Sequence, residues 1–293
     1  MPVTVAATQM ACSWNVDDNV DRAEVLVREA AAAGANIILL QELFETPYFC
    51  IDEQSAHFDL ARPLGEQPTV DRMQTLAKEL GVVLPVSFFE KAGLAHYNAV
   101  AVIDADGSVC GHYRKSHIPE FPLYQEKYYF SPGDTGFRAF DTGYGRIGIG
   151  ICWDQWFPEA ARAMMLMGAE MLFYPTAIGS ELDKPDFDSK AHWQMAMRGH
   201  AAANIVPVVA SNRVGTETSG ELSMDFYGSS FIAGPTGELV AEADRVSSGV
   251  LTQVFDLAEI AAFRREWGVF RDRRPDLYRP LLSLDGTHHV ADD

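Results

Sequence analysis

The sequence GANIILLQE at residues 34–42 and its near-copy GAEMLFYPT at 168–176 decide the fold. In each segment a glycine follows a helical stretch, at the place where a helix end requires a positive φ, and an apolar strand comes next. A strand-like run also lies upstream of each helical stretch, at 3–9 and at 146–152. One strand–helix–strand unit is therefore predicted twice in this chain.

Each half then continues with a second helix, an apolar strand and a hairpin. In the first half, the apolar residues of 68–80 fall on one helical stripe, and Gly81 follows the last of them. The second half repeats this order with a helix predicted over 190–204. The other matching predictions are the strands 82–88 and 205–211 and the hairpin turns 104–107 and 234–237.

The repeated order predicts the α/β class, as a four-layer α-β-β-α sandwich of two similar halves. Each half reads β-α-β-α-β-β-β, with helices on one face of its sheet. The other face of each sheet must also be covered, and the sheet of the other half is its natural cover. Alternating strands and helices occur in any α/β protein, but the matched order and the shared segments favour a duplication.

The domain organisation follows from the absence of any low-complexity linker in the 293 residues. Residues 1–263 are predicted to form a single domain. Residues 264–293 differ, because they are rich in arginine, contain Pro275 and Pro280, and show no periodicity. They are predicted to form an extended C-terminal arm, which packs either on its own body or on a second subunit.

The charge balance limits the partners of the protein. The chain has 23 basic and 41 acidic residues, a net charge of −18. Nucleic-acid binding needs a basic face and is therefore not expected. A negative surface concentrates cations, although it also serves solubility alone. The start of the chain lacks the features of a signal peptide, and no apolar run is long enough for a membrane span, so we expect a cytoplasmic protein.

Several common cofactor motifs are absent from the sequence. It contains no HExxH, no GxxxxGK[ST] and no GxGxxG after a strand, so neither a metal nor a nucleotide cofactor is expected. The four cysteines, which form no CxxC pair, are Cys12, Cys50, Cys110 and Cys152.

Cys152 is the first candidate for chemistry. It lies on the turn that leaves the predicted strand 146–151, shortly before a helix predicted over 157–167. A thiol in such a turn is held rigidly, and a helix N-terminus favours its thiolate form. The alternative is a small residue of the core.

Two further candidates also follow predicted strands. Glu42 comes directly after Ile-Ile-Leu-Leu, where a carboxylate loses part of its hydration and can act as a general base. Lys115 follows the predicted strand 109–113 and could donate hydrogen bonds to an oxyanion. Alone, each is more simply a surface residue. Together with Cys152 they lie at the carboxyl ends of strands, where the sites of α/β proteins gather.

Two other interpretations remain open at this point. A cysteine–histidine enzyme would use His117, the histidine nearest in sequence, but no stretch resembles a cysteine-protease signature. A non-catalytic interaction module could also retain the fold.

Three motifs resemble the signature regions of the nitrilase superfamily of carbon–nitrogen hydrolases. They are LLQELFETPYF around Glu42, YRKSHIP around Lys115 and GIGICWDQWFPE around Cys152, and the resemblance covers nearly the whole chain. It implies a Glu-Lys-Cys triad that hydrolyses non-peptide C–N bonds of linear amides through a thioester on Cys152. It also implies that no cofactor is needed, and that the protein forms homo-oligomers built on a dimer.

The segments 124–137, 210–215 and 267–278 are similar to a branch of this superfamily that acts on carbamoyl amines in polyamine synthesis. This similarity implies a small cationic carbamoyl amine as substrate. It also implies a second glutamate beside the triad, either Glu126 or Glu120. The sequence departs from the resemblance at Phe121 and Leu123, where smaller residues are expected, and a narrower pocket mouth is therefore predicted.

A substrate ammonium group would need a carboxylate or an aromatic face. A solvated acidic loop that caps the following helix is the alternative interpretation of the carboxylates at 181–188. A substrate with an acidic far end, such as an N-carbamoyl-β-amino acid, would instead need a cation, for which Arg198 and Arg213 are candidates. The predicted substrate-binding residues are Tyr124, Trp153, Trp156, Glu181 and Asp186, with Asp183 and Asp188 as further carboxylates.

Overall fold

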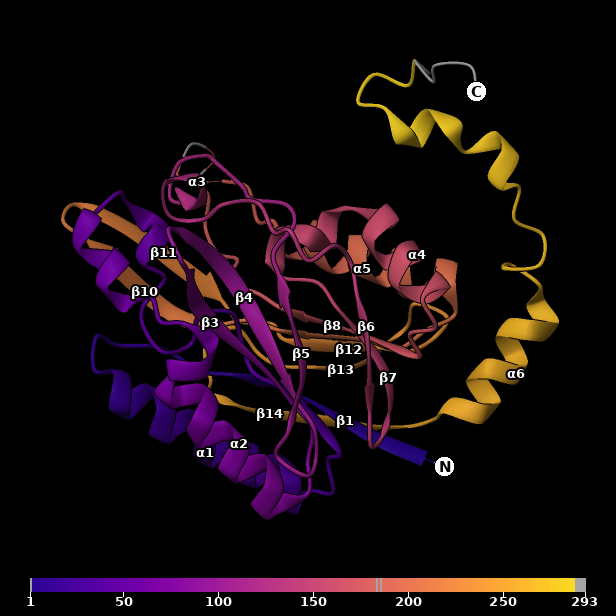
Figure 1. Ribbon diagram of the computed structural model, residues 1–293, viewed down its shortest axis with the longest axis horizontal. Coiled ribbons are helices and arrows are strands. Elements are labelled where there is room, and N and C mark those ends of the chain that lie inside the picture. The colour runs from indigo at the N-terminus through magenta and orange to yellow at the C-terminus, as the bar shows by residue number, and fades with distance from the viewer. Residues whose placement is uncertain (1, 183, 185, 288–293) are drawn as a thin grey trace.

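The computed structural model describes residues 2–182, 184 and 186–287, and it contains the two predicted halves (Figure 1). The first half comprises β1 (Pro2–Gln9), α1 (Val16–Ala32), β2 (Ile37–Leu39), α2 (Pro68–Leu80), β3 (Leu84–Ala92), β4 (Ala95–Ile103) and β5 (Val109–Arg114). Between β2 and α2 lie the short 3₁₀ helices η1 (Phe49–Ile51), η2 (Ser55–Leu60) and η3 (Leu64–Glu66).

The second half begins after the short helix α3 (Glu126–Tyr129). It comprises β6 (Ala139–Thr142), β7 (Gly145–Ile149), η4 (Cys152–Trp156), α4 (Pro158–Leu166), β8 (Met171–Pro175), α5 (Lys190–Asn204), β9 (Val208–Ser211), β12 (Phe231–Ala233) and β13 (Leu239–Glu242). The remaining elements are β10 (Val214–Ser219), β11 (Leu222–Tyr227), β14 (Gly249–Asp256), α6 (Leu257–Trp267), η5 (Pro275–Leu277) and η6 (Arg279–Leu282).

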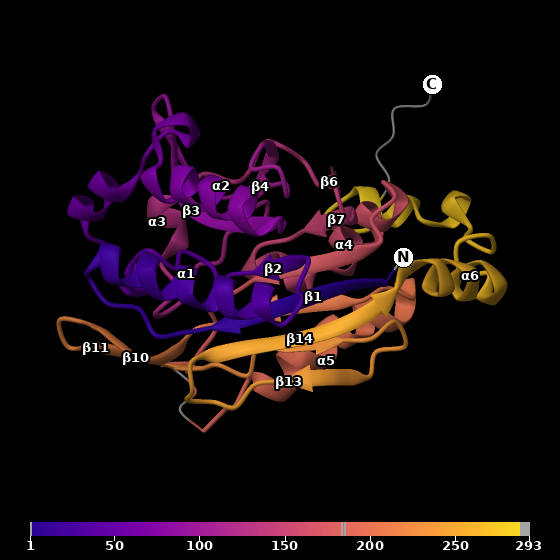
Figure 2. The same cartoon turned by 90° about the horizontal axis from the view of Figure 1, so that it is seen from below.

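The two sheets have matching strand orders. One is ordered β13-β12-β9-β8-β7-β6. The other runs β14-β1-β2 and continues, through a parallel bridge between Ile37 and Val83, into β3-β4-β5. Figure 2 shows β14 beside β1, although the two strands lie near opposite ends of the chain. The predicted four-layer sandwich is confirmed, with α1 and α2 outside one sheet and α4 and α5 outside the other (Figure 1).

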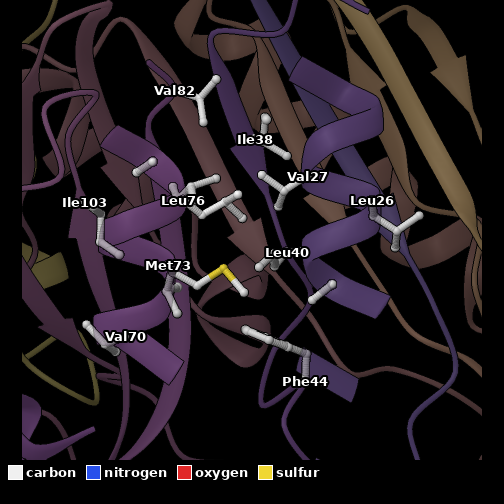
Figure 3. Close-up of a cluster of buried hydrophobic side chains, with 14 of the residues drawn as sticks. Leu26, Val27, Ile38, Leu40, Phe44, Val70, Met73, Leu76, Val82 and Ile103 are labelled. Carbon is white, nitrogen blue, oxygen red and sulfur yellow. The ribbon is translucent and has the colours of Figure 1, made fainter. Parts of the chain in front are cut away.

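The central strands carry apolar side chains on both faces, so each face of a sheet must be covered. Successive side chains of a strand point to opposite faces. Ile38 and Leu40 accordingly pack toward α1 and α2 (Figure 3), whereas Ile37 and Leu39 belong to the core between the sheets. In β8, Leu172 packs toward α4 and α5 in the same way.

The local predictions at the helix ends are also confirmed. Gly34 and Gly168 have φ values of 90° and 91°, and Gly81 ends α2 in the left-handed region. The predicted strand at 205–211 was too long at its start, because Ile205 is the left-handed cap of α5 and β9 begins at Val208. In the part of the chain that the structure describes, the hairpin β10–β11 has no counterpart in the first half.

The C-terminal segment leaves the body of the molecule and curves around beside α4 and α5 (Figure 1). Helix α6 extends to Trp267, so the predicted arm boundary at residue 264 falls inside a helix. Arg264 donates hydrogen bonds to the carbonyl oxygens of Asn204 and Ile205, at the end of α5. Within the described ranges, none of the helices has the length and apolar character that crossing a membrane requires.

Candidate active site

Glu42, Lys115 and Cys152 meet at one edge of the sandwich, each just beyond the end of a strand. Glu42 follows β2, Lys115 follows β5, and Cys152 begins η4 after β7. The side chains of Glu42 and Lys115 have no exposed surface, and Lys115 Nζ lies 2.9 Å from Glu42 Oε1. The charges of both residues act on the Cys152 thiol. The three predicted residues are therefore brought together.

The backbone of Cys152 adopts a conformation that is uncommon for a side chain of its kind. Its φ is 39°, in the left-handed region where residues other than glycine are strained. The turn requires Gly150, because a Cβ atom there would lie 2.6 Å from a ring carbon of Tyr174. Asp154 closes the turn by accepting a hydrogen bond from the Ile151 N–H at 2.9 Å. The strained backbone of Cys152 is therefore held in place by the residues on either side of it in the turn.

Asp154 also ties this turn to the segment that carries Lys115. Its Oδ2 accepts a hydrogen bond from the Tyr113 hydroxyl at 2.8 Å, and its Oδ1 accepts one from the His117 N–H at 3.0 Å. His117 Nδ1 lies 2.7 Å from the same Oδ1, and its ring stacks on Phe157 at 3.6 Å. His117 is therefore engaged in joining two loops, and these contacts give no support to a cysteine–histidine pair.

The protonation state of Cys152 differs from the expectation of a helix-stabilised thiolate. Burial, followed by the charge of Glu42, raises the pKa of the Cys152 thiol well above its usual range, although Lys115 acts in the opposite direction. The helix α4 begins only at Pro158, too far along the chain to reverse this effect. The direction of this shift favours the neutral thiol over the thiolate, so Cys152 would need a base in order to react as a thiolate.

Glu42 has one carboxylate oxygen engaged and one available. Oε1 accepts hydrogen bonds from Lys115 Nζ at 2.9 Å and from Asn98 Nδ2 at 2.6 Å. Oε2 is buried and has no hydrogen-bond partner among the described residues. An unpaired buried carboxylate oxygen is costly and marks a position for a proton or a ligand.

The second glutamate at this site is Glu126, the first residue of α3. Its two oxygens lie 2.8 and 2.7 Å from Lys115 Nζ, and the Tyr48 hydroxyl donates to Oε1 at 2.6 Å. Burial raises the pKa of Glu126 to about 7, against the opposing effect of Lys115. Burial lowers the pKa of Lys115, but Glu126 and Glu42 outweigh it and hold this pKa well above its usual value. The alternative, Glu120, is exposed and accepts a hydrogen bond from the Lys127 N–H.

An aromatic cavity lies next to the turn that carries Cys152, since Trp153, the residue after the cysteine, lines it. It is lined by Phe121, Trp153, Trp156, Glu181, Lys184, Phe187, Ser189 and His192. Tyr124 stands between this cavity and the buried carboxylates, with its ring 4.6 Å from that of Phe121 and 5.9 Å from that of Tyr48. Burial and then the charge of Glu181 raise the pKa of Tyr124, on which Cys152 also acts. Glu181 and Cys152 are therefore both within electrostatic reach of Tyr124.

Other predicted binding residues lie elsewhere. Asp186 is exposed and lines a different cleft, together with Asp188, which forms an ion pair with Arg245 at 2.7 Å. Glu181 lines the aromatic cavity, whereas Asp186 and Asp188 line the other cleft, so these three carboxylates do not share one cavity. Asp183 lies outside the described residues.

The two candidate arginines for an acidic substrate are both engaged in the protein. Arg213 is fully buried and pairs with Glu217 at 2.7 Å. Arg198 donates to the carbonyl oxygen of Gly237 at 2.6 Å. Neither residue lines the aromatic cavity.

Sequence reasoning missed Asn98 and Tyr48, which donate hydrogen bonds to Glu42 and Glu126, and it missed Asp154, which accepts one from Ile151 beside Cys152. Nothing in the local pattern distinguishes them, because their roles depend on contacts between distant segments. Among the described residues there is no group of three or more His, Cys, Asp or Glu side chains arranged to hold a metal ion.

Comparison with known proteins identifies the class. Residues 4–265 match the family model described as carbon–nitrogen hydrolase, and the chain belongs to this family. A solved carbon–nitrogen hydrolase from Helicobacter pylori G27 superposes with a TM-score of 0.91 at 38% identity, covering 97% of this chain and 99% of that chain. The predicted nitrilase-type fold is thereby confirmed.

Individual relatives are more similar in sequence. A protein of Arabidopsis thaliana named N-carbamoylputrescine amidase is 62% identical over 288 residues, which are 97% of this chain and 96% of the relative. A protein of Francisella tularensis named citrullinase is 54% identical over 280 residues, covering 96% of this chain and 98% of the relative.

Proposed function

We propose that this protein hydrolyses N-carbamoylputrescine to putrescine, ammonia and carbon dioxide. The observation that carries the proposal is the buried group of Glu42, Lys115 and Glu126, whose charges all act on the Cys152 thiol. Such a group combines a base, an oxyanion donor and a nucleophile. The identities of 61–62% to proteins named N-carbamoylputrescine amidase support this substrate.

The first half of the reaction forms a thioester. Glu42 Oε2, which is free of partners within the described chain, accepts the proton of Cys152 as the sulfur attacks the carbamoyl carbon. Lys115 Nζ donates to the developing oxyanion, in a buried site where such a contact is strong. The protonated Glu42 returns its proton to the leaving nitrogen, and ammonia departs. The product is a carbamoyl thioester on Cys152.

The second half of the reaction releases the thiol. Glu42 removes a proton from water, which attacks the thioester carbon, and the proton returns to the Cys152 sulfur. The carbamate that leaves then decays to putrescine and carbon dioxide. Glu126 holds Lys115 through two contacts of 2.8 and 2.7 Å and keeps it charged during both steps. Two easier steps thus replace one difficult step.

The far end of the substrate carries an ammonium group. Glu181 provides a carboxylate in the aromatic cavity, and Trp153 and Trp156 provide its walls. Lys184 is the cationic residue among those lining this cavity. An N-carbamoyl-β-amino acid or another acidic ω-amide would depend on that single exposed lysine, so the cationic substrate is favoured.

We also propose a homo-oligomer built on a dimer, working in the cytoplasm in polyamine synthesis. Exposed apolar side chains gather on the C-terminal segment, and they are Trp267, Leu277, Leu281, Leu282 and Leu284. Tyr278, Leu281 and Leu282 line a groove with α4 and α5, which a second copy would cover. The four cysteines are all free, as is usual in a reducing compartment.

The test is ammonia release from N-carbamoylputrescine, N-carbamoyl-β-alanine and citrulline at equal concentrations. Cys152→Ala protein serves as the blank. A strong preference for the cationic compound is the expected result. Preference for citrulline or for the β-alanine derivative would leave the hydrolase assignment in place and contradict the proposed substrate.

A further inference from the structure

We infer that the buried ion pair of Arg213 and Glu217 is a positioning device, which holds both ends of the loop 42–48 and thereby sets the two carboxylates around Lys115. This inference rests on the proposed function, because it assigns Glu42 the role of base. Neither residue touches the reacting atoms. The argument depends on which backbone groups the pair holds.

Arg213 holds the start of the loop. Its Nη2 donates hydrogen bonds to the carbonyl oxygens of Glu42 at 2.7 Å and Leu43 at 3.1 Å, and its Nη1 reaches the carbonyl oxygen of Thr46 at 3.3 Å. The fork geometry of a guanidinium group allows this multiple contact, which an ammonium group cannot reproduce. The backbone of the proposed base is thus fixed by a residue of the other half.

Leu43 explains why the loop needs such support. Its φ is 48°, in the left-handed region that costs a branched side chain energy. The turn directs the carbonyl groups of residues 42 and 43 toward the same guanidinium. Without that charge, two buried carbonyl dipoles would lose their partner, and the loop would relax toward ordinary φ values.

Glu217 holds the other end of the loop. Its Oε1 accepts a hydrogen bond from Arg213 Nη1 at 2.7 Å, and its Oε2 accepts one from the N–H of Tyr48. The hydroxyl of Tyr48 in turn donates to Glu126 Oε1 at 2.6 Å. One ion pair therefore reaches Glu42 through its backbone and Glu126 through Tyr48. Glu217 is 5% exposed and Arg213 is fully buried, so solvent does not weaken the pair.

The experiment compares Glu217→Gln with Tyr48→Phe and with the double variant. Glu217→Gln keeps the shape of the side chain and removes its charge. A displacement of about 1 Å at a reacting group lowers a rate about 100-fold, so we expect kcat to fall about 10- to 100-fold. KM should stay within about twofold, because the aromatic cavity is untouched. The two single effects on kcat should not multiply in the double variant, since both act on Glu126.

A second readout does not depend on the substrate assignment. Alkylation of Cys152 by iodoacetamide, followed by peptide mass analysis, reports on proton removal by Glu42. Glu217→Gln should slow it in parallel with kcat, even if N-carbamoylputrescine is not the substrate. If Glu217→Gln fails to fold, Glu217→Asp replaces it. Its shorter side chain keeps the charge but moves the carboxylate away from Arg213 and Tyr48.

The control is Val102→Ala, a buried residue of β4 that lies four positions beyond Asn98 along the strand. It should lower the free energy of unfolding and leave kcat and alkylation unchanged at a temperature where the protein is fully folded. Folded Glu217 variants with normal kcat and normal alkylation would overturn the inference. Equal losses of kcat in the Val102→Ala protein would also overturn it, by showing that any loss of stability suffices.

Discussion

The two halves of the molecule share a backbone plan and differ in chemistry. β1 pairs with β2 from Val5 and Ile37 onward, as β7 pairs with β8 from Ile147 and Met171 onward. These registers make Val5 equivalent to Ile147 and Ile37 equivalent to Met171. Counting onward from them, Met10 is the equivalent of Cys152, and Glu42 is the equivalent of Thr176. Each of these two equivalent pairs therefore contains one candidate for chemistry, Glu42 in the first half and Cys152 in the second. The candidate site occurs once, although the fold is duplicated.

The equivalent positions are adjacent in space. The N–H of Glu42 donates to the carbonyl oxygen of Thr176 at 3.4 Å, so the two matching strand ends touch where the halves join. Met10 is buried in the apolar core against α1, and Thr176 donates a hydrogen bond to Gln155. Hydrophobic pattern therefore determines the backbone in both halves, whereas single side chains at the strand ends determine the chemistry.

The largest expected effect comes from the Cys152 and Met10 pair. Cys152→Ala removes the nucleophile, and ammonia release should fall at least about 10⁴-fold while the protein stays folded. Met10→Ala should leave kcat of the folded protein nearly unchanged and lower the free energy of unfolding by about 2–5 kcal/mol. Steady-state assays and urea denaturation check both. Substantial turnover by Cys152→Ala would refute its role as nucleophile.

The next effect concerns Glu42 and Thr176. Glu42→Gln retains a contact to Lys115 but cannot accept a proton, so kcat should fall about 10²- to 10⁴-fold. Thr176→Val removes the hydroxyl that donates to Gln155 Oε1 at 3.1 Å and to the Tyr174 carbonyl oxygen at 3.2 Å, and it should change kcat by less than about tenfold. Single-turnover measurements of ammonia release are the readout. Comparable losses of kcat in both variants would mean that kcat depends on the contact between the strand ends at Glu42 and Thr176 rather than on the Glu42 carboxylate.

A smaller effect is expected at the substrate pocket, where Glu181 and Asp186 can be compared. Glu181→Gln should raise KM for N-carbamoylputrescine about tenfold or more, because a charge-assisted contact is lost. Asp186→Asn, in the neighbouring cleft, should leave KM unchanged. Initial rates over a range of substrate concentrations separate KM from kcat. If Asp186→Asn raises KM instead, the assignment of the ammonium pocket is wrong.

These pairs of residues also show which features of the fold and the site could be predicted from the sequence alone. The helix ends at Gly34 and Gly168 were predictable, because a positive φ and the strand that follows are local properties. The meeting of Glu42, Lys115 and Cys152 followed from the common edge at which strands end. The raised pKa of the Cys152 thiol was not predictable, since its burial depends on both halves. Tyr48 and Asn98 acquire their partners only through tertiary contacts, which leave no spacing in the sequence.

The smallest effect is a pH dependence of stability that belongs to Glu126. Burial raises its pKa from an ordinary value of 4.5 to about 7 in the folded protein. Between these values the folded protein binds a proton that the unfolded chain has lost, so stability falls as pH rises. The stabilising contribution is fully present below pH 4.5 and is lost as pH rises through about 7.

Glu126→Gln cannot titrate and should therefore lack this fall. The measurement is the free energy of unfolding in urea from pH 5 to 8 for both proteins. Burial also raises the pKa of Glu45 to about 7, but Glu45 is present in both proteins and cancels in their difference. That difference should shift in favour of Glu126→Gln as pH rises and level off above about 7. Parallel curves would mean that Lys115 keeps Glu126 ionised in the folded protein across this range, so that the ion pair of these two residues persists from pH 5 to 8.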